Sequence, residues 1–183
     1  MRRFSTSALV LTGAFAAAGL ALDVVSKQLV RAFLMPGTEP WKWQNKVLIP
    51  DILTINPTRN PDGLFGLSYG PHWLYLVLPV LGIALVAWFV FRNRQKLAGV
   101  AYGLILAGAL GNLVDRFTLG WVVDFIDFRI PGLGFRWFTF NLADAFIVAG
   151  IIGLLVAELF GRKSAPQPEP TAPGPESGTP PPE

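Results

Sequence analysis

The chain alternates between long apolar runs and polar stretches that hold most of its charged residues. A bilayer span takes about 20 predominantly apolar residues when it forms a helix. Four runs meet this requirement, at residues 7–33, 72–91, 97–116 and 144–160. The pattern therefore predicts a mainly α-helical membrane protein with four transmembrane helices, built as one domain over residues 1–163.

Two longer segments, residues 34–71 and 116–143, connect the spans on one side of the membrane and are expected to form outer loops. The first contains the run Val47–Asn56, which is rich in β-branched residues and bounded by prolines. That pattern is typical of short strands. Its Trp41 and Trp43 suit the headgroup layer, where indole rings are enriched. The second loop is rich in aromatic residues and is predicted to form a strand-like lip against the membrane.

The positive residues at the span ends predict the orientation of the chain. They gather at three sites that a four-span topology places on the same side of the membrane: Arg2, Arg3, Arg92, Arg94, Lys96, Arg162 and Lys163. The positive-inside rule assigns this side to the cytoplasm. Both termini are therefore expected to be cytoplasmic, and both long loops to lie outside.

The two ends of the chain differ in what their residues predict. Residues 164–183 are rich in Pro, Glu, Ser and Gly, cannot bury a core, and are expected to form a disordered cytoplasmic tail. At the other end, Arg2 and Arg3 before an alanine-rich apolar run also resemble a cleavable signal peptide. A retained first span fits the charge pattern better.

Composition narrows the possible chemistry. Hydrophobic residues make up 52% of the chain and charged residues 15%, which is typical of a membrane protein. A net charge of +3, with no basic face interleaved with aromatics, argues against a nucleic-acid partner. The absence of cysteine excludes a thiol nucleophile and a thiolate metal site. The single histidine, His72, argues against a zinc site or a Ser-His-Asp triad and is interpreted as interfacial.

For catalysis, carboxylate chemistry or a Ser/Lys pair remains. We expect neither a metal nor a cofactor. Ser26 and Lys27 are neighbours that would not face each other in a helix. The segment Gly108–Asp144 holds a third of the acidic residues, although apolar runs flank it. Acids beside a bilayer are costly and usually functional.

Asp144 is the first catalytic candidate. Asn141 precedes the fourth apolar run and suits the N-cap position, which places Asp144 at the third helical residue, where the helix dipole favours a carboxylate. A capping pair without catalytic function is the simpler interpretation. Asp124 and Asp127 are the candidate partners, and three residues apart on a strand they point to opposite faces. Periodicity leaves that choice open, and the other acid is expected to be solvated or paired with an arginine at the surface.

Two carboxyl groups that share one proton supply a base and an acid at one pH, and can activate water to cut a peptide bond. Asn112 could orient one of the acids, and Arg116 could hold a lipid or peptide carbonyl. Asp115 and Arg116 lie together at the end of a span, so they also suit a pair that anchors the helix at the membrane interface. Asp23 and Lys27 form an i,i+4 pair in the first span. Two alternatives remain: a small transporter whose acids line a polar path, and a scaffold whose acids only cap helices.

Four motifs resemble the lipoprotein signal peptidase (signal peptidase II) family over residues 7–160. They are D-V-V-S-K at Asp23–Lys27, G-A-L-G-N-L-V-D-R at Gly108–Arg116, V-V-D-F-I-D at Val122–Asp127 and F-N-L-A-D at Phe140–Asp144. The resemblance implies that Asp124 and Asp144 are the catalytic pair. It also implies supporting roles for Asp23, Lys27, Asn60, Asn112, Asp115, Arg116, Asn141 and Ala143.

The family resemblance further implies a bacterial inner-membrane aspartic peptidase whose active site faces outward. Its substrates would be prolipoproteins, cut just before a diacylglyceryl-modified cysteine, and its other partners membrane lipids; we expect a monomer. It implies a small β-rich extracytoplasmic cradle, a mobile helix over the site and inhibition by globomycin. One motif departs: N-x-G-A-A-F-G is expected where Asn60–Gly66 reads N-P-D-G-L-F-G, so Asp62 replaces glycine and Gly63 comes one position late.

Overall fold

The computed structural model describes residues 6–61, 71, 73–92 and 96–161. Its four helices are α1 Thr6–Leu34, α2 Leu74–Val90, α3 Lys96–Leu119 and α4 Leu142–Gly161. Its strands are β1 Lys46–Ile49, β2 Leu53–Asn60, β3 Val122–Ile130 and β4 Phe135–Arg136, and a 3-10 helix, η1, covers Pro40–Lys42. Helices α1, α3 and α4 are long and apolar enough to cross a membrane, and α2 is a shorter apolar helix. The predicted mainly helical membrane fold is confirmed.

The C-terminal end of α3 differs from the predicted end of the third span. The third span was expected to end at residue 116, but α3 continues to Leu119. Asp115 and Arg116 lie within the last two turns of α3, and both contact residues of the site described below. Gly120 ends the helix, with a φ of 79° and its N–H bonded to the Arg116 carbonyl. A left-handed glycine is a common helix C-terminus.

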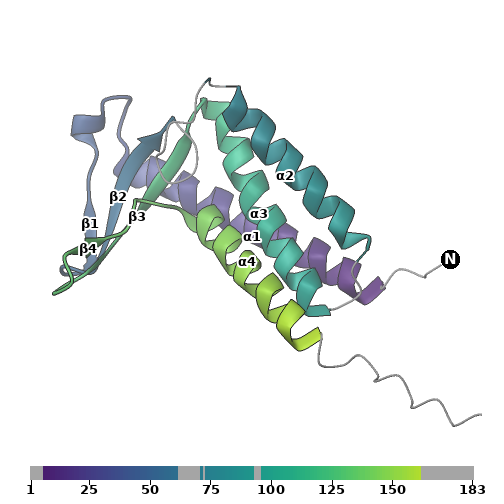
Figure 1. Cartoon of the computed structure of the whole chain (residues 1–183). Helices are drawn as coiled ribbons and strands as arrows, with labels where there is room; N and C mark the ends of the chain where they lie inside the picture. Colours follow the sequence, from purple (N-terminus) through teal and green to yellow (C-terminus); the bar gives the residue numbers. More distant parts are fainter. Residues whose placement is uncertain (1–5, 62–70, 72, 93–95, 162–183) are drawn as a thin grey trace, which may run out of the picture.

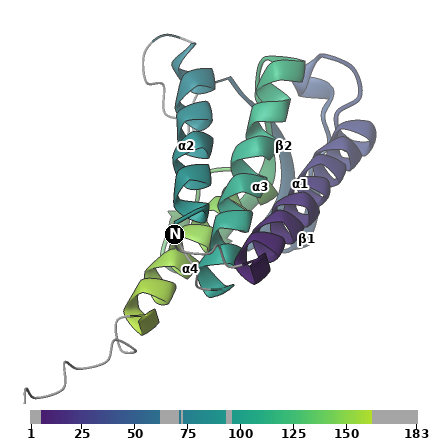
Figure 2. The same ribbon diagram turned by 90° about the vertical axis from the view of Figure 1, so that its right-hand side faces the viewer.

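Helix α3 lies at the centre of the bundle, between α1 and α2 in Figure 2, and α4 packs against it as well. Glycines permit the closest approaches. A Cβ at Gly99 would lie 2.7 Å from the Ala8 carbonyl oxygen, and one at Gly103 would lie 2.7 Å from that of Thr12. The Thr12 hydroxyl also donates to the Gly99 carbonyl at 2.9 Å. Small residues at helix contacts are typical of membrane bundles, where apolar burial alone does not drive association.

The strands form one antiparallel sheet, in the order β1-β2-β3-β4, at one end of the bundle (Figure 1). The predicted strands in both loops are confirmed, whereas η1, which Pro40 begins, was not anticipated. The β2–β3 register shifts between Ile55 and Thr58, where Pro57 has no N–H to pair. Bulges of this kind re-aim side chains near active sites. Beyond this one, Asn60 lies opposite Val122, two residues from Asp124.

Several expectations lie outside the described residues. They concern His72, the charged positions 2, 3, 94, 162 and 163, the departing loop positions Asp62 and Gly63, the mobile helix, and the tail at residues 164–183. Retention of the first span stays a prediction, which the close packing of α1 on α3 supports.

Replacing Gly111 with alanine is expected to destabilise the fold. A Cβ there would overlap the buried Asp23 carboxylate, so the change should cost about 1–3 kcal/mol of unfolding free energy. Gly13→Ala is the matched control, because nothing lies within 4 Å of its added Cβ. Denaturant unfolding in detergent micelles measures both variants. Equal stability of the two would contradict the tight contact at Gly111.

Candidate active site

Asp144 lies in the first turn of α4, where the Asn141 cap fixes it. The Asn141 side-chain oxygen accepts the Asp144 backbone N–H at 2.9 Å, and the Asp144 Oδ2 accepts the Asn141 backbone N–H at 3.3 Å. This reciprocal arrangement is a capping box. The predicted N-cap is therefore confirmed. The other Asp144 oxygen, Oδ1, accepts a hydrogen bond from the Asn112 amide at 2.8 Å.

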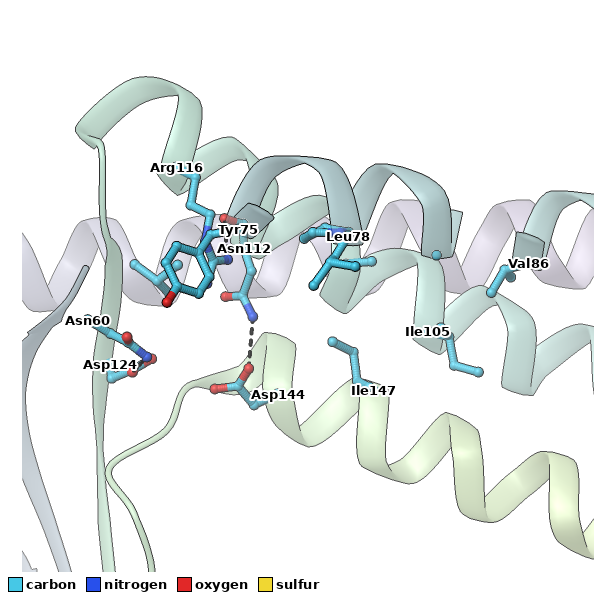
Figure 3. A pocket seen from close by; sticks show the side chains of 14 residues that line it. Asn60, Tyr75, Leu78, Val86, Ile105, Asn112, Arg116, Asp124, Asp144 and Ile147 are labelled. Carbon is cyan, nitrogen blue, oxygen red and sulfur yellow. Dashed lines mark hydrogen bonds between the residues drawn. The ribbon is translucent and has the colours of Figure 1, made fainter. Parts of the chain in front are cut away.

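Asp124 reaches the same place from β3. Its side chain is buried, and each oxygen accepts an amide hydrogen bond: Oδ1 from Asn141 at 2.6 Å and Oδ2 from Asn60 at 2.8 Å. Asn141 therefore touches both acids, donating to Asp124 and capping Asp144. Figure 3 shows the two carboxylates on one pocket, with Asn60 and Asn112 beside them.

Asp127 points away from this pocket. Arg129 and Arg136 each donate two hydrogen bonds to it, with ion-pair distances of 3.0 and 2.7 Å. The hydrogen bond from Arg129, reinforced by Arg136, lowers the pKa of Asp127 to about 2. The expected arginine pairing is confirmed. Asp127 itself is only 1% exposed, because the two arginines, whose side chains are about half exposed, cover it at the surface.

Burial raises the pKa of Asp124, and the negative charge of Asp144 raises it further, to about 7. The hydrogen bonds from Asn60 and Asn141 stabilise the ionised form and limit the rise. Two nearby carboxyl groups titrate as a coupled pair, and the first ionisation makes the second harder. The pair therefore keeps one proton up to near-neutral pH.

Lys27 is the centre of a buried polar network beneath the two acids. Its Nζ lies 2.8 Å from Asp23 Oδ2 and 3.1 Å from Asp115 Oδ2, and donates to Asn112 Oδ1 at 2.9 Å. Lys27 is 2% exposed and Asp23 is fully buried. The predicted i,i+4 pair is confirmed. Buried carboxylates need such a partner, because each would otherwise face a large desolvation penalty.

The network fixes the two elements that hold the acids. Asp23 Oδ1 accepts the backbone N–H of Ala143 at 2.9 Å, which ties α1 to the start of α4 just before Asp144. Asp115 Oδ2 accepts the backbone N–H of Val123 at 3.0 Å, which ties α3 to β3 just before Asp124. The interpretation of Asp115 as an interfacial anchor is therefore wrong. Its carboxylate is directed into the protein.

The pocket has a polar end and an apolar wall. Its volume is about 270 Å³. Asp124, Asp144 and Arg116 line the polar end, where the Arg116 Nη1 also donates to the Asn112 carbonyl at 3.3 Å. The apolar wall comes from α2, α3 and α4: Leu78, Pro79, Gly82, Val86, Ile105, Ala109 and Ile147. The pocket can therefore receive an apolar chain with a polar group at the acids (Figure 3).

Tyr75 is a residue at the polar end of the pocket that the sequence analysis missed. It is 5% exposed and lines the polar end of the pocket from the first turn of α2 (Figure 3). An aromatic residue at the start of an apolar run normally suggests an interfacial anchor. Its place in the pocket depends on which face of α2 meets α3, and a helix that is apolar all round does not encode that face. Among the residues that the structure describes, no three His, Cys, Asp or Glu side chains are grouped to hold a metal ion. The expectation of no metal and no cofactor stays a prediction.

Comparison with known proteins decides the family. The sequence profile of signal peptidase (SPase) II matches residues 15–160, most of the chain. The chain belongs to the signal peptidase II family. This membership identifies an aspartic peptidase of the membrane, so the alternative interpretations as a transporter or a scaffold are set aside.

Relatives and solved structures agree with this signal peptidase II assignment. The lipoprotein signal peptidase of Syntrophomonas wolfei is 38% identical over 143 residues, covering 78% of this chain and 88% of the relative. The lipoprotein signal peptidase of Beijerinckia indica is 34% identical over 174 residues, covering 90% of this chain and 96% of the relative. A bacterial membrane enzyme solved at 2.3 Å resolution superposes with a TM-score of 0.75 at 26% identity, covering 93% of this chain and 99% of that one.

Proposed function

We propose that this signal peptidase II removes the signal peptides of diacylglyceryl-modified prolipoproteins, cutting just before the lipid-modified cysteine. Asp124 and Asp144 activate the attacking water. The observation that supports this best is their meeting at the polar end of an otherwise apolar pocket, with Asn141 bonded to both.

The chemistry follows from a pair of carboxyl groups that shares one proton. The ionised group takes a proton from water, whose oxygen attacks the scissile carbonyl. The protonated group donates its proton to the departing amine as the C–N bond breaks. Both products then leave without a covalent enzyme intermediate. The raised pKa of Asp124 supports this scheme, because the pair still holds its proton near neutral pH.

The other site residues have supporting roles. Arg116, Asn112 and Tyr75 line the polar end and are placed to hold the substrate backbone beside the acids. Asn60 orients Asp124, while Asp23, Lys27, Asp115, Asn141 and Ala143 position the two catalytic elements. The apolar wall suits the acyl chains or the hydrophobic segment of a lipidated signal peptide, because ligand sites of this kind are mostly apolar with a few placed polar groups.

The chain is a multi-pass bacterial membrane protein, and we infer that both termini are cytoplasmic and the active site faces outward. Arg92 and Lys96 lie at the ends of α2 and α3 remote from the sheet, which supports this orientation by the positive-inside rule. The sheet then forms an extracytoplasmic cradle beside the site. Prolipoproteins and membrane lipids are the partners of this unit, which works as a monomer over residues 1–163.

A pair of matched substrates tests the proposed specificity. Purified protein is incubated with a lipidated and an unlipidated prolipoprotein, with and without globomycin, and the new termini are identified by mass spectrometry. We expect cleavage only of the lipidated form, immediately before its modified cysteine, and inhibition by globomycin. Cleavage of the unlipidated form alone would show that lipid recognition is not part of the function.

A further inference from the structure

A second pocket lies behind the active site, on the other face of the β2–β3 pair. It has a volume of about 520 Å³ and lies between the sheet end of α1 and the strands. Arg59 lines it and is followed on β2 by Asn60, which bonds to Asp124. Consecutive residues of a strand point to opposite faces. The second pocket is therefore separate from the one proposed for substrate.

Arg59 is held in this pocket by two indole rings. Its guanidinium carbon lies 5.1 Å from the Trp43 ring centroid and 4.9 Å from that of Trp121. Its Nη2 donates to the Thr38 carbonyl at 3.0 Å. Cation–π contacts on two rings fix the plane of the guanidinium, and a fixed fork of donors suits a phosphate better than a mobile ammonium does.

The positive charge of this pocket has no acidic partner among the described residues. Arg31 lines the pocket from the last turn of α1. Neither Arg31 nor Arg59 forms an ion pair within the described part of the chain, and nearby Glu39 is paired with Lys42. Gln28 adds an amide to the same lining. Two uncompensated guanidinium groups in one concave site are suited to an anion.

From these observations we infer that Arg31 and Arg59 bind the phosphate of an anionic phospholipid headgroup. The position of the pocket favours a lipid over free phosphate. Arg31 stands three residues before the end of the membrane-spanning helix α1, where the chain leaves the apolar layer. Trp43 and Trp121 have the indole rings that are enriched at this depth. The net positive charge favours an anionic headgroup over a zwitterionic one.

Native mass spectrometry of the full-length protein, released from nanodiscs that contain equal amounts of phosphatidylglycerol and phosphatidylcholine, tests this inference without measuring proteolysis. We expect preferential retention of phosphatidylglycerol, and a loss of about fivefold in its occupancy in Arg31→Gln and in Arg59→Gln. Lys46→Gln is the matched control, because it removes an exposed charge from β1 on the same side of the membrane. It should retain phosphatidylglycerol like the unchanged protein.

Three further measurements make the outcome decisive. Thermal unfolding checks that Arg31→Gln, which removes an exposed side chain, leaves the fold intact. Arg59→Lys keeps the charge but loses the planar fork, and should also reduce occupancy. Inorganic phosphate is added in competition. Equal retention of both lipids, or unchanged retention in Arg31→Gln, would overturn the inference. If inorganic phosphate binds and phosphatidylglycerol is not preferred, the ligand of this pocket is free phosphate and the inferred lipid headgroup is wrong.

Discussion

Asp124→Asn and Asp144→Asn are each expected to reduce cleavage of a lipidated prolipoprotein by about 10³-fold or more. A positioned general acid or base contributes about 10²–10⁴-fold, and an amide can perform neither proton transfer. The size and planar shape of the side chain are kept, although the new NH2 group replaces one oxygen that accepts a hydrogen bond from a neighbouring N–H. The fold should persist with some loss of stability, which thermal unfolding checks. Initial rates with purified protein in micelles or nanodiscs measure the effect.

Asp127→Asn is the matched control on the same strand. The Asp127 carboxylate pairs with Arg129 and Arg136 and does not line the active-site pocket. The activity of the variant should therefore stay close to that of the unchanged protein. The comparison separates the loss of a catalytic group from a general loss of acidic charge on β3. An active Asp124→Asn together with an inactive Asp127→Asn would reverse the assignment.

Lys27→Met is expected to be the most damaging change outside the two catalytic residues. It leaves the buried carboxylates of Asp23 and Asp115 without their cation, and removing one partner from such a network costs about 3–5 kcal/mol. Activity should fall as well. Asp23 and Asp115 hold the backbone just before each catalytic acid, and Lys27 also fixes the amide of Asn112 that donates to Asp144.

Lys42→Met serves as the control for the loss of a lysine. Lys42 pairs with Glu39 at the exposed surface, where an ion pair contributes at most about 1 kcal/mol. Denaturant unfolding and cleavage rates are measured on both variants. Adding Asp23→Asn to Lys27→Met removes one buried carboxylate that has lost its cationic partner, and should recover part of the lost stability. Normal stability and activity in Lys27→Met would contradict the positioning role of the network.

Local patterns predicted the helices and part of the site correctly. Apolar runs located the four helices, because the bilayer imposes a minimum length on each span. The cap at Asn141 placed Asp144, because an N-cap preference depends only on neighbouring residues. The strands of the first loop followed from their β-branched residues. These features depend on residues within a few positions of one another.

Features that depend on tertiary contacts were harder to predict from the sequence. Periodicity placed Asp124 and Asp127 on opposite faces but did not say which face met α4, and only the family resemblance favoured Asp124. The i,i+4 spacing showed that Lys27 could pair with Asp23, but not that both are buried or that Lys27 reaches Asn112, 85 positions away. Tyr75 was missed for the same reason. Its place in the pocket comes from how α2 packs on α3.

The pH dependence of kcat/KM tests the central claim, which is that Asp124 and Asp144 act as a pair sharing one proton. Cleavage of a lipidated prolipoprotein is followed between about pH 5 and 9, with Asp127→Asn as the reference variant. Asp124 has its pKa raised to about 7, so the pair loses its proton as pH rises through that value. We predict that kcat/KM falls on the alkaline side with an apparent pKa near 7, equally in both proteins. A rate that rises steadily through this range would mean that the pair works fully ionised, and would contradict the account.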